Sequence, residues 1–295
     1  MRPLRGIVPP LVTPLRARDR LDLAGLERLV EHVLAGGVRG IFLLGTTGEG
    51  PSLSHRLRRE LVRRACRLVR GRVPVLVGVT DTSFVESVAL ARRAADCGAS
   101  ALVLSAPYYF PAGQPELAEY VERIASELPL PVFLYNMPSH TKLAFEPATL
   151  RRLMDLPGVV GMKDSSGDLA YFRRIARLSA ARSDWSLLVG PETMIPTAVR
   201  AGAHGAVSGG ANLFPRLFTD LFRAARNGGA AELQARVLRL QETVFAVGRH
   251  PSSYLKGLKC ALSLLGICDD FMAEPFSRFR APEREAVRSR LAAAT

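Results

Sequence analysis

Apolar residues along the 295-residue chain follow two alternating patterns. Short runs rich in Val, Ile and Leu, bounded by Gly, Pro or polar residues, are typical of strands that are buried on both faces of a sheet. Between these runs, apolar residues recur at every third or fourth position, which is the spacing of an amphipathic helix. The pattern predicts eight strands, at residues 7–11, 41–44, 75–77, 101–104, 131–135, 159–164, 185–189 and 205–207.

A helix is predicted after each strand. The first covers residues 21–34, the second begins near Ser54, and the third begins at Ser83, where Glu86 completes a capping-box sequence. The others cover residues 115–127, 147–154, 169–180, 194–201 and 214–226. Strict alternation with short connections predicts a parallel sheet, and eight units suit a closed (β/α)₈ TIM barrel. An open doubly wound sheet is the alternative, but no G-x-G-x-x-G sequence follows the first strand.

The chain beyond the eighth unit shows no further strand pattern. Three helices are predicted there, at residues 233–247, 254–265 and 282–291. We therefore expect a barrel domain at residues 1–228 and a C-terminal three-helix extension at residues 229–295.

Composition and charge narrow the class of protein. The formal net charge is +13, but arginines recur on most predicted helices and few aromatic residues lie among them. This distribution is typical of solvated helix faces, so we expect no nucleic-acid site, although the charge would attract an anionic substrate. No apolar run approaches the length that spans a membrane, and the N-terminus lacks the apolar region of a secretory signal. We therefore expect no association with membranes.

The cysteines give no sign of a disulfide framework or a metal site. Cys66, Cys97, Cys260 and Cys268 are scattered, without a metal-type or C-x-x-C spacing. We interpret them as reduced thiols, which predicts a cytoplasmic protein.

The predicted strand at residues 159–164 carries the most distinctive chemistry. Side chains alternate along a strand, so Lys163 shares a face with Val159 and Gly161 and closes an otherwise apolar strand. Only four of the 40 Lys and Arg residues are lysines, and arginine cannot lose the proton that an amine nucleophile must lose. Burial disfavours the charged form of an amine, so Lys163 is a candidate for Schiff-base chemistry. A lysine whose head group reaches water is the alternative.

Other candidates lie at the carboxyl ends of the strands, where TIM barrels place their active sites. After the second strand, Gly45-Thr46-Thr47-Gly48 offers two hydroxyls and flexible backbone amides that suit a carboxylate, unless it is a plain turn. After the fourth strand, Tyr108 and Tyr109 belong to an aromatic group that, taken alone, is more typical of packing than of a functional site.

The remaining strand ends add further polar groups. Tyr135 ends the fifth strand, where its phenol could move a proton beside an amine or simply be a buried, satisfied hydroxyl. His140 follows in a loop and is either a polar surface residue or a functional one. Glycines after the seventh strand, at Gly190, and around Ser208 leave room for a ligand. Asn212 is a candidate N-cap of the next helix.

Taken together, these residues resemble the dihydrodipicolinate synthase/N-acetylneuraminate lyase family of class I aldolases. The matching segments follow the family order and cover nearly the whole chain: Gly45-Thr46-Thr47-Gly48-Glu49, Pro107-Tyr108-Tyr109, Tyr135-Asn136-x-Pro138, Gly161-Met162-Lys163-Asp164 and Gly205-Ala206-Val207-Ser208. The resemblance implies a TIM barrel with a C-terminal helical region, no metal, no organic cofactor, and a homotetramer built as a dimer of dimers.

The resemblance also implies a role for each matching residue. Lys163 matches the Schiff-base lysine, and Tyr135 matches the tyrosine that relays protons at the bound 2-oxo acid. Thr46 and Thr47 match the pair that binds its carboxylate, with Thr46 also in the proton relay. Tyr109 matches a tyrosine that completes the relay from a neighbouring subunit. Positions that line the substrate pocket are matched by Gly190, Val207 and the adjoining Ser208.

One position departs from the pattern of dihydrodipicolinate synthase itself. That enzyme has an arginine that holds a substrate carboxylate where this chain has His140, and a neutral imidazole binds a carboxylate more weakly than a guanidinium. The leading hypothesis is therefore an aldolase or lyase acting on pyruvate, or on a pyruvate-containing 2-oxo acid such as a 2-keto-3-deoxy sugar acid. An aldehyde would be its second substrate, in contact with His140. The alternatives are dihydrodipicolinate synthase, which condenses pyruvate with aspartate semialdehyde, and a metabolite-binding barrel without catalysis.

Overall fold

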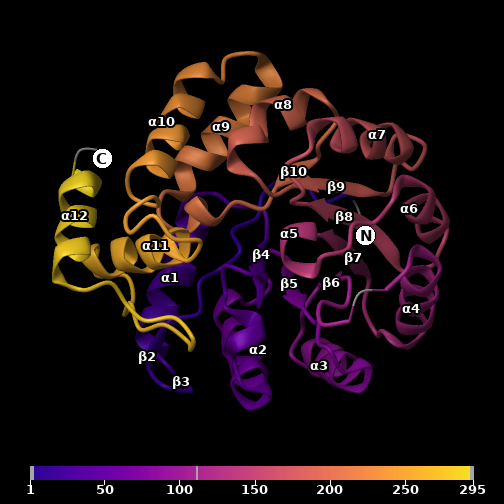
Figure 1. The fold of residues 1–295 in the computed structure, drawn as a ribbon, viewed down its shortest axis with the longest axis horizontal. Coiled ribbons are helices and arrows are strands. Elements are labelled where there is room, and N and C mark those ends of the chain that lie inside the picture. The colour runs from indigo at the N-terminus through magenta and orange to yellow at the C-terminus, as the bar shows by residue number, and fades with distance from the viewer. Residues whose placement is uncertain (1–2, 111, 293–295) are drawn as a thin grey trace.

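Eight parallel strands form the inner wall of the structure, a computed structural model that describes residues 3–110 and 112–292 (Figure 1). In the sheet they follow the order β1-β10-β9-β8-β7-β6-β5-β4. The strands are β1 (Gly6–Ile7), β4 (Ile41–Leu43), β5 (Val75–Gly78), β6 (Ala101–Ser105), β7 (Val132–Asn136), β8 (Val159–Asp164), β9 (Ser186–Val189) and β10 (Gly205–Ala206).

The sheet closes on itself between the chain after β1 and strand β4. Pro10 and Phe42 form a parallel bridge, in which Leu11 N donates to Phe42 O at 2.9 Å and Phe42 N donates to Pro9 O at 3.0 Å. The predicted (β/α)₈ TIM barrel is thereby confirmed. Strand β1 is shorter than predicted because Pro9 and Pro10 have no N–H to contribute to a ladder.

Helices surround the barrel, as each strand–helix unit requires (Figure 1). Ser54 caps the second helix, and Ser83 caps the third by accepting from Glu86 N. The Glu86 carboxylate does not return to Ser83; it contacts His55 and Arg59, so only half of the predicted capping box forms. The helices are α1 (Leu23–Ala35), α2 (His55–Val69), α3 (Phe84–Asp96), α4 (Gln114–Glu127), α6 (Pro147–Met154), α7 (Leu169–Ser179), α8 (Ile195–Arg200) and α9 (Pro215–Asn227).

Several short elements were not predicted. Leu15–Ala17 (β2) and Arg20–Leu21 (β3) pair as a small antiparallel sheet, and Pro138–Thr141 forms the short helix α5. Three 3₁₀ turns, η1 (Gly50–Ser52), η2 (Glu192–Met194) and η3 (Gly209–Asn212), follow β4, β9 and β10.

Asn212 is not the helix cap that its position suggested. Helix α9 begins at Pro215, after the cap residue Phe214. The Asn212 side chain instead accepts from Val12 N at 3.1 Å and donates to Pro10 O at 2.9 Å, so it ties the end of η3 to the chain that follows β1.

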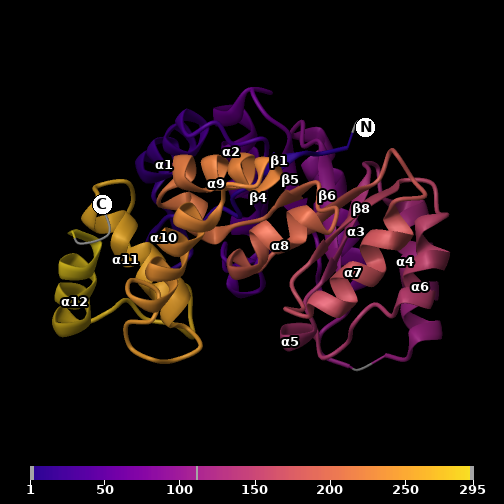
Figure 2. The same cartoon turned by 90° about the horizontal axis from the view of Figure 1, so that it is seen from above.

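The C-terminal helices lie together on one side of the barrel (Figure 2). They are α10 (Ala231–Glu242), α11 (Ser253–Leu264) and α12 (Ala281–Ala292), and α10 ends five residues earlier than predicted. Val237 and Leu258 are buried in the same hydrophobic cluster as the helices around the barrel. The predicted domain boundary at residue 228 therefore stays a prediction. Residues 1–2, 111 and 293–295 lie outside the described part of the chain.

A second apolar cluster fills the inside of the barrel. Phe42, Leu76, Val103, Phe133 and Leu188 are its main large side chains. None of the helices in residues 3–110 and 112–292 is both long and apolar enough to cross a membrane.

Candidate active site

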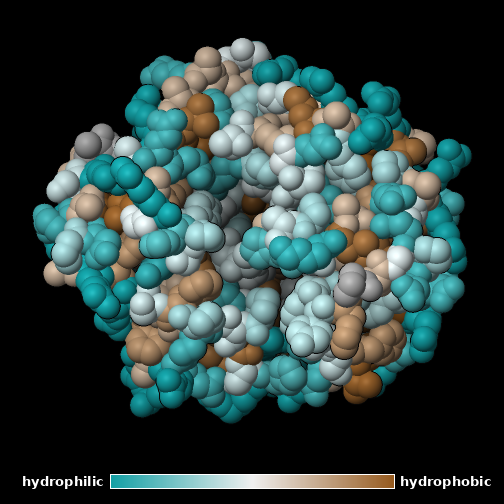
Figure 3. All heavy atoms as spheres, viewed as in Figure 1, coloured by the Kyte–Doolittle hydropathy of each residue, from teal (hydrophilic) through white to brown (hydrophobic). Residues whose placement is uncertain are grey.

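A cavity of about 720 Å³ opens where the strands end. It is seen as a hollow near the middle of the face in Figure 3, which looks onto the carboxyl ends of the strands. The strand ends and their loops supply one part of its wall, and helices α10 and α11 supply another. The lining includes Thr46, Thr47, Ser105, Tyr108, Tyr135, Met137, His140, Lys163, Ser165, Gly190, Glu192, Val207, Gln241 and Tyr254.

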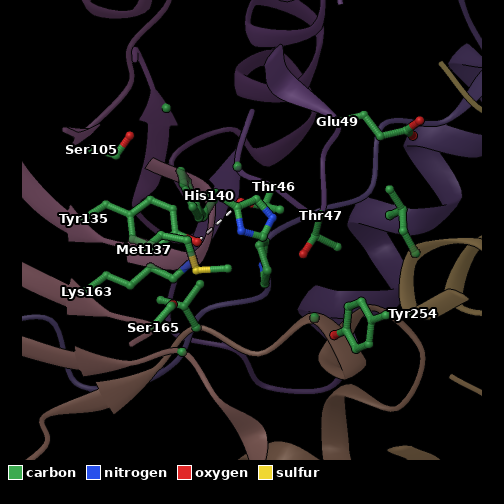
Figure 4. A pocket seen from close by; sticks show the side chains of 18 of the residues that line it. Thr46, Thr47, Glu49, Ser105, Tyr135, Met137, His140, Lys163, Ser165 and Tyr254 are labelled. Atoms are coloured by element: carbon green, nitrogen blue, oxygen red, sulfur yellow. Dashed lines mark hydrogen bonds between the residues drawn. The ribbon is translucent and has the colours of Figure 1, made fainter. Parts of the chain in front are cut away.

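Lys163 projects from β8 into this cavity (Figure 4). Its side chain is only 6% exposed, so the alternative of a solvent-exposed strand-end lysine is wrong. The Lys163 Nζ lies 3.9 Å from the centre of the Tyr135 ring and 5.2 Å from that of Phe42. Within the described residues, no carboxylate pairs with this amine, which leaves it available to a ligand.

Tyr135 lies beside Lys163 because β7 and β8 pair with these two residues in register. Its hydroxyl is 3.4 Å from Thr46 Oγ1 (Figure 4). Burial acts to raise the pKa of this phenol, but the positive charge of Lys163 and the hydrogen bond with Thr46 outweigh it, so the pKa lies below its ordinary value. A phenol of lowered pKa next to an amine is suited to exchanging a proton with it.

The loop after β4 holds Thr46 and Thr47 in a strained turn. Leu44 and Glu49, on either side of the threonines, both adopt left-handed backbone angles, with φ of 60° and 55°. Such angles cost about 1 kcal/mol or more for each residue that is not glycine, and persist only where the surroundings impose them. A Cβ on Gly45 would lie 2.6 Å from the Phe42 ring, so the turn also needs glycine there.

A buried ion pair imposes this turn. Glu49 and Lys259 are both 0% exposed, and Glu49 Oε1 lies 2.7 Å from Lys259 Nζ. The same ammonium donates to Thr13 O and Phe271 O, while Glu49 Oε2 accepts from Ala273 N at 2.7 Å. Helix α11 thus anchors the threonine loop. The sequence analysis missed this pair, although a lysine on the apolar face of a predicted helix, in a chain with four lysines, was a signal.

Ser165 is a second lining residue that the sequence analysis missed. It follows β8 and lies against Gly190, where an added Cβ would come within 1.9 Å of the Ser165 hydroxyl. Gly190 therefore lines the cavity, as predicted, because only a glycine permits this close approach. Val207 also lines the cavity.

Ser208 is not among the lining residues. Its hydroxyl is buried and finds no hydrogen-bond partner within the described part of the chain. Its predicted contact with substrate therefore stays a prediction.

Glu192 lines the cavity next to the C-terminal helices. Its carboxyl accepts from Gly210 N at 2.6 Å, from the Tyr254 hydroxyl at 3.3 Å and from the Gln241 amide. Burial raises the pKa of Glu192 to about 7, because the loss of water outweighs these hydrogen bonds.

His140 lies in helix α5, not in a loop as predicted, and it lines the mouth of the cavity. Its Nδ1 is 3.0 Å from the Ser139 hydroxyl. Partial burial, with the charges of Lys142 and Lys163, places the pKa of His140 below its ordinary value.

Tyr109 lies outside the cavity of its own chain. Its side chain is 76% exposed and packs edge-to-face on Phe110, with ring centres 5.0 Å apart. Tyr108, its neighbour, does line the cavity.

No group of three His, Cys, Asp or Glu side chains within residues 3–110 and 112–292 could hold a metal ion. All four cysteines are free, in keeping with their interpretation as thiols.

Known proteins are similar to this chain in both sequence and fold. The sequence profile of the dihydrodipicolinate synthetase family matches residues 3–294. This chain belongs to the dihydrodipicolinate synthetase family. A 4-hydroxy-tetrahydrodipicolinate synthase from Phenylobacterium zucineum is 35% identical over 295 residues, which cover 98% of this chain and 96% of that protein.

Solved structures of the dihydrodipicolinate synthetase family have the same fold. Dihydrodipicolinate synthase from Bacteroides thetaiotaomicron superposes with a TM-score of 0.97 at 53% identity, over 99% of both chains. YagE from E. coli K12, solved in complex with pyruvate, superposes with a TM-score of 0.92 at 28% identity, over 98% of both chains. Membership confirms the resemblance seen in the sequence and makes this chain an enzyme of a family of lyases of the class I aldolase type.

Proposed function

We propose that the chain is a Schiff-base-forming aldolase that acts on pyruvate, or on a 2-oxo acid containing it, through Lys163. The observation that carries this proposal is the buried Lys163 amine, without a carboxylate partner in the described structure and 3.9 Å from the Tyr135 ring. Pyruvate bound to YagE, a protein of the same family, supports the choice of donor.

In the proposed reaction, the hydroxyls of Thr46 and Thr47 hold the carboxylate of the 2-oxo acid. The amine of Lys163 attacks the ketone carbon, and Tyr135 moves a proton from the nitrogen to the departing oxygen. Water leaves and an iminium forms, whose nitrogen accepts the electron pair released when the adjacent carbon loses a proton or a carbon fragment. The resulting enamine then attacks an aldehyde in the direction of synthesis.

The wall of the cavity favours a neutral, hydroxylated aldehyde as the second substrate. Among the described residues, no arginine lines the cavity and Lys163 is its single lysine. The polar side chains of the wall are instead mostly hydroxyls, from residues such as Thr80, Ser105 and Thr193, together with the amide of Gln241. Such groups match the hydroxyls of a 2-keto-3-deoxy sugar acid better than a second carboxylate, which a guanidinium would bind more strongly.

Dihydrodipicolinate synthase activity is the second candidate, because relatives from P. zucineum and B. thetaiotaomicron carry that name. A direct comparison separates the two. With pyruvate as donor, we expect kcat/KM for glycolaldehyde or glyceraldehyde to exceed that for aspartate semialdehyde. The variant His140→Arg should raise the value for aspartate semialdehyde about 10-fold or more, the effect of one charge-assisted hydrogen bond. A wild-type preference for aspartate semialdehyde would instead establish the second candidate.

We also propose a homotetramer, a dimer of dimers in which Tyr109 reaches the site of a neighbouring subunit. Its support is the position of Tyr109 and Phe110, which are 76% and 78% exposed and lie outside the cavity of their own chain. The cytoplasmic location stays a prediction.

The variant Tyr109→Phe tests this arrangement, since it removes a hydroxyl and keeps the ring. We expect kcat to fall about 10-fold or more if the hydroxyl completes a proton relay. Sedimentation should show an unchanged mass of four subunits. A wild-type protein that is monomeric and fully active would contradict the proposal.

A further inference from the structure

Lys163 and Tyr135 lie beside each other in one particular register of strands β7 and β8 (Figure 4). Pairing begins with Val132 of β7 opposite Val159 of β8. Tyr135, three residues further along β7, lies opposite Lys163, four residues further along β8, so β8 holds one extra residue, a β-bulge. Without the bulge, Tyr135 would lie opposite Met162, which packs in the hydrophobic cluster shared with the helices and not inside the barrel.

The bulge also corrects one expectation from the sequence. Val159 and Met162 both pack in the cluster shared with the helices, although residues three apart on a regular strand face opposite sides. The prediction that Val159 shares a face with Lys163 is therefore wrong, because it assumed regular alternation along the whole of β8.

A buried hydrogen bond between side chains joins the two strands just beyond the reactive pair. Backbone groups alone do not select a register, since every residue but proline offers the same N–H and C=O. Directly after Tyr135 and Lys163, Asn136 Nδ2 donates to Asp164 Oδ1 at 2.8 Å. The two residues are only 1% and 0% exposed. A slip of one residue would part this donor from its acceptor away from water, where an unpaired polar group is costly.

Further contacts fix Asn136 and Asp164 from the helix side of the sheet, and neither residue lines the cavity. Asn136 Oδ1 accepts from Phe145 N at 3.1 Å, and the Tyr171 hydroxyl, on α7, donates to Phe145 O at 2.6 Å. The Asp164 carboxyl accepts from Ser166 N at 3.2 Å and from the Ser166 hydroxyl at 3.0 Å. The hydrogen bond between Asn136 and Asp164 can therefore act on the strands without touching a substrate.

We propose that Asn136 and Asp164 are positioning residues, whose hydrogen bond fixes the bulged register and so holds the Lys163 amine beside the Tyr135 phenol. The assignment rests on the proposed function of Lys163. A displacement of about 1 Å between reacting groups can lower a rate about 100-fold. The threonines proposed to bind the carboxylate of pyruvate lie in another loop, which helix α11 anchors, so the affinity for pyruvate does not depend on this hydrogen bond.

Trapping with pyruvate and borohydride at successive times separates positioning from binding. The rate constant of adduct formation at saturating pyruvate reports the geometry of the amine and the phenol. The pyruvate concentration that gives half of this rate reports binding. Asn136→Leu removes the hydrogen bond at nearly unchanged volume, and we expect the rate constant to fall about 100-fold while the half-saturating concentration stays within about threefold of wild type.

Matched variants show whether the loss of any buried hydrogen bond would have the same effect. Tyr171→Phe removes a donor from the same network but not from the pair between the strands. Its midpoint of urea unfolding should fall, while the rate constant of adduct formation stays within about threefold of wild type. Asp164→Asn keeps an acceptor for Asn136 and should also stay within about threefold, whereas Asp164→Leu should behave as Asn136→Leu does.

An exchange of the two side chains gives a second test, which decides the question if Asn136→Leu does not fold. Asn136→Asp places a second carboxylate against Asp164 and should lower the rate constant about 10-fold or more. Adding Asp164→Asn to Asn136→Asp restores one donor and one acceptor between the strands and should recover most of this loss. Circular dichroism would show that each variant is folded.

The outcomes separate the positioning role from the chemistry of Lys163. A rate constant for Asn136→Leu within about threefold of wild type, or equal losses in Asn136→Leu and Tyr171→Phe, would overturn the positioning role and leave Lys163 chemistry standing. No recovery in the double variant would overturn it as well. A wild type that forms no adduct with pyruvate would contradict the proposed function instead.

Discussion

Replacing Lys163 by arginine is expected to abolish turnover and the borohydride-trapped adduct with pyruvate. Arginine keeps the positive charge and much of the length of lysine, but it cannot lose a proton to become a nucleophile. Removal of a covalent nucleophile typically lowers kcat by about 10⁴-fold or more. Intact mass and peptide mapping after reduction with borohydride would measure the adduct, and a coupled assay would measure turnover.

The chain provides matched controls for this experiment. Lys142 is exposed and Lys256 is half-buried, and neither lines the cavity. Lys142→Arg and Lys256→Arg should therefore keep both the adduct and wild-type turnover. An adduct that maps to either of these lysines, or one that survives in Lys163→Arg, would refute Schiff-base chemistry at Lys163.

Breaking the buried pair of Glu49 and Lys259 is expected to have the largest effect on stability. Both side chains are fully buried, so Glu49→Gln leaves the Lys259 ammonium without a counter-ion and away from water. We expect the free energy of unfolding to fall by about 3–5 kcal/mol, the typical cost of removing one partner of a buried pair. Urea unfolding followed by circular dichroism would measure this change.

The same substitution tests whether the pair positions the threonine loop. Glu49 follows Thr46 and Thr47 and holds their strained turn, so the KM for pyruvate should rise in any Glu49→Gln protein that remains folded. The double variant Glu49→Gln/Lys259→Met removes both charges and should unfold at a higher urea concentration than Glu49→Gln alone. Equal midpoints for Glu49→Gln and wild type would show that the pair contributes no net stability.

The barrel and the residues at its centre could be predicted from local patterns. Strand–helix alternation specifies a parallel barrel, and in a barrel all carboxyl ends of strands meet at one face. Lys163, Tyr135 and Thr46, each near a strand end, therefore had to lie close together, and they do. Their proximity could be predicted because it depends on position within a strand.

Contacts that depend on tertiary packing could not be predicted in this way. Glu49 and Lys259 are 210 residues apart, and no local pattern links them. Asn212 is a residue type that often caps helices, yet its side chain forms hydrogen bonds with Val12 and Pro10 instead. Ser165 lines the cavity only because Gly190 allows the neighbouring strand to approach. In each case a partner distant in the sequence decides the outcome.

The origin of the two walls of the cavity has a consequence for how such enzymes diversify. Lys163, the proposed nucleophile, and Tyr135 come from adjacent strands, whereas Gln241 and Tyr254 come from helices outside the eight-unit repeat. Substitutions in those helices alter the shape of the part of the cavity that we propose binds the aldehyde. The strands that carry Lys163 and Tyr135 keep their register. The preference for one aldehyde over another can therefore change by mutation without a change in the proposed Schiff-base chemistry. Laboratory evolution toward new aldehyde substrates should begin in α10 and α11.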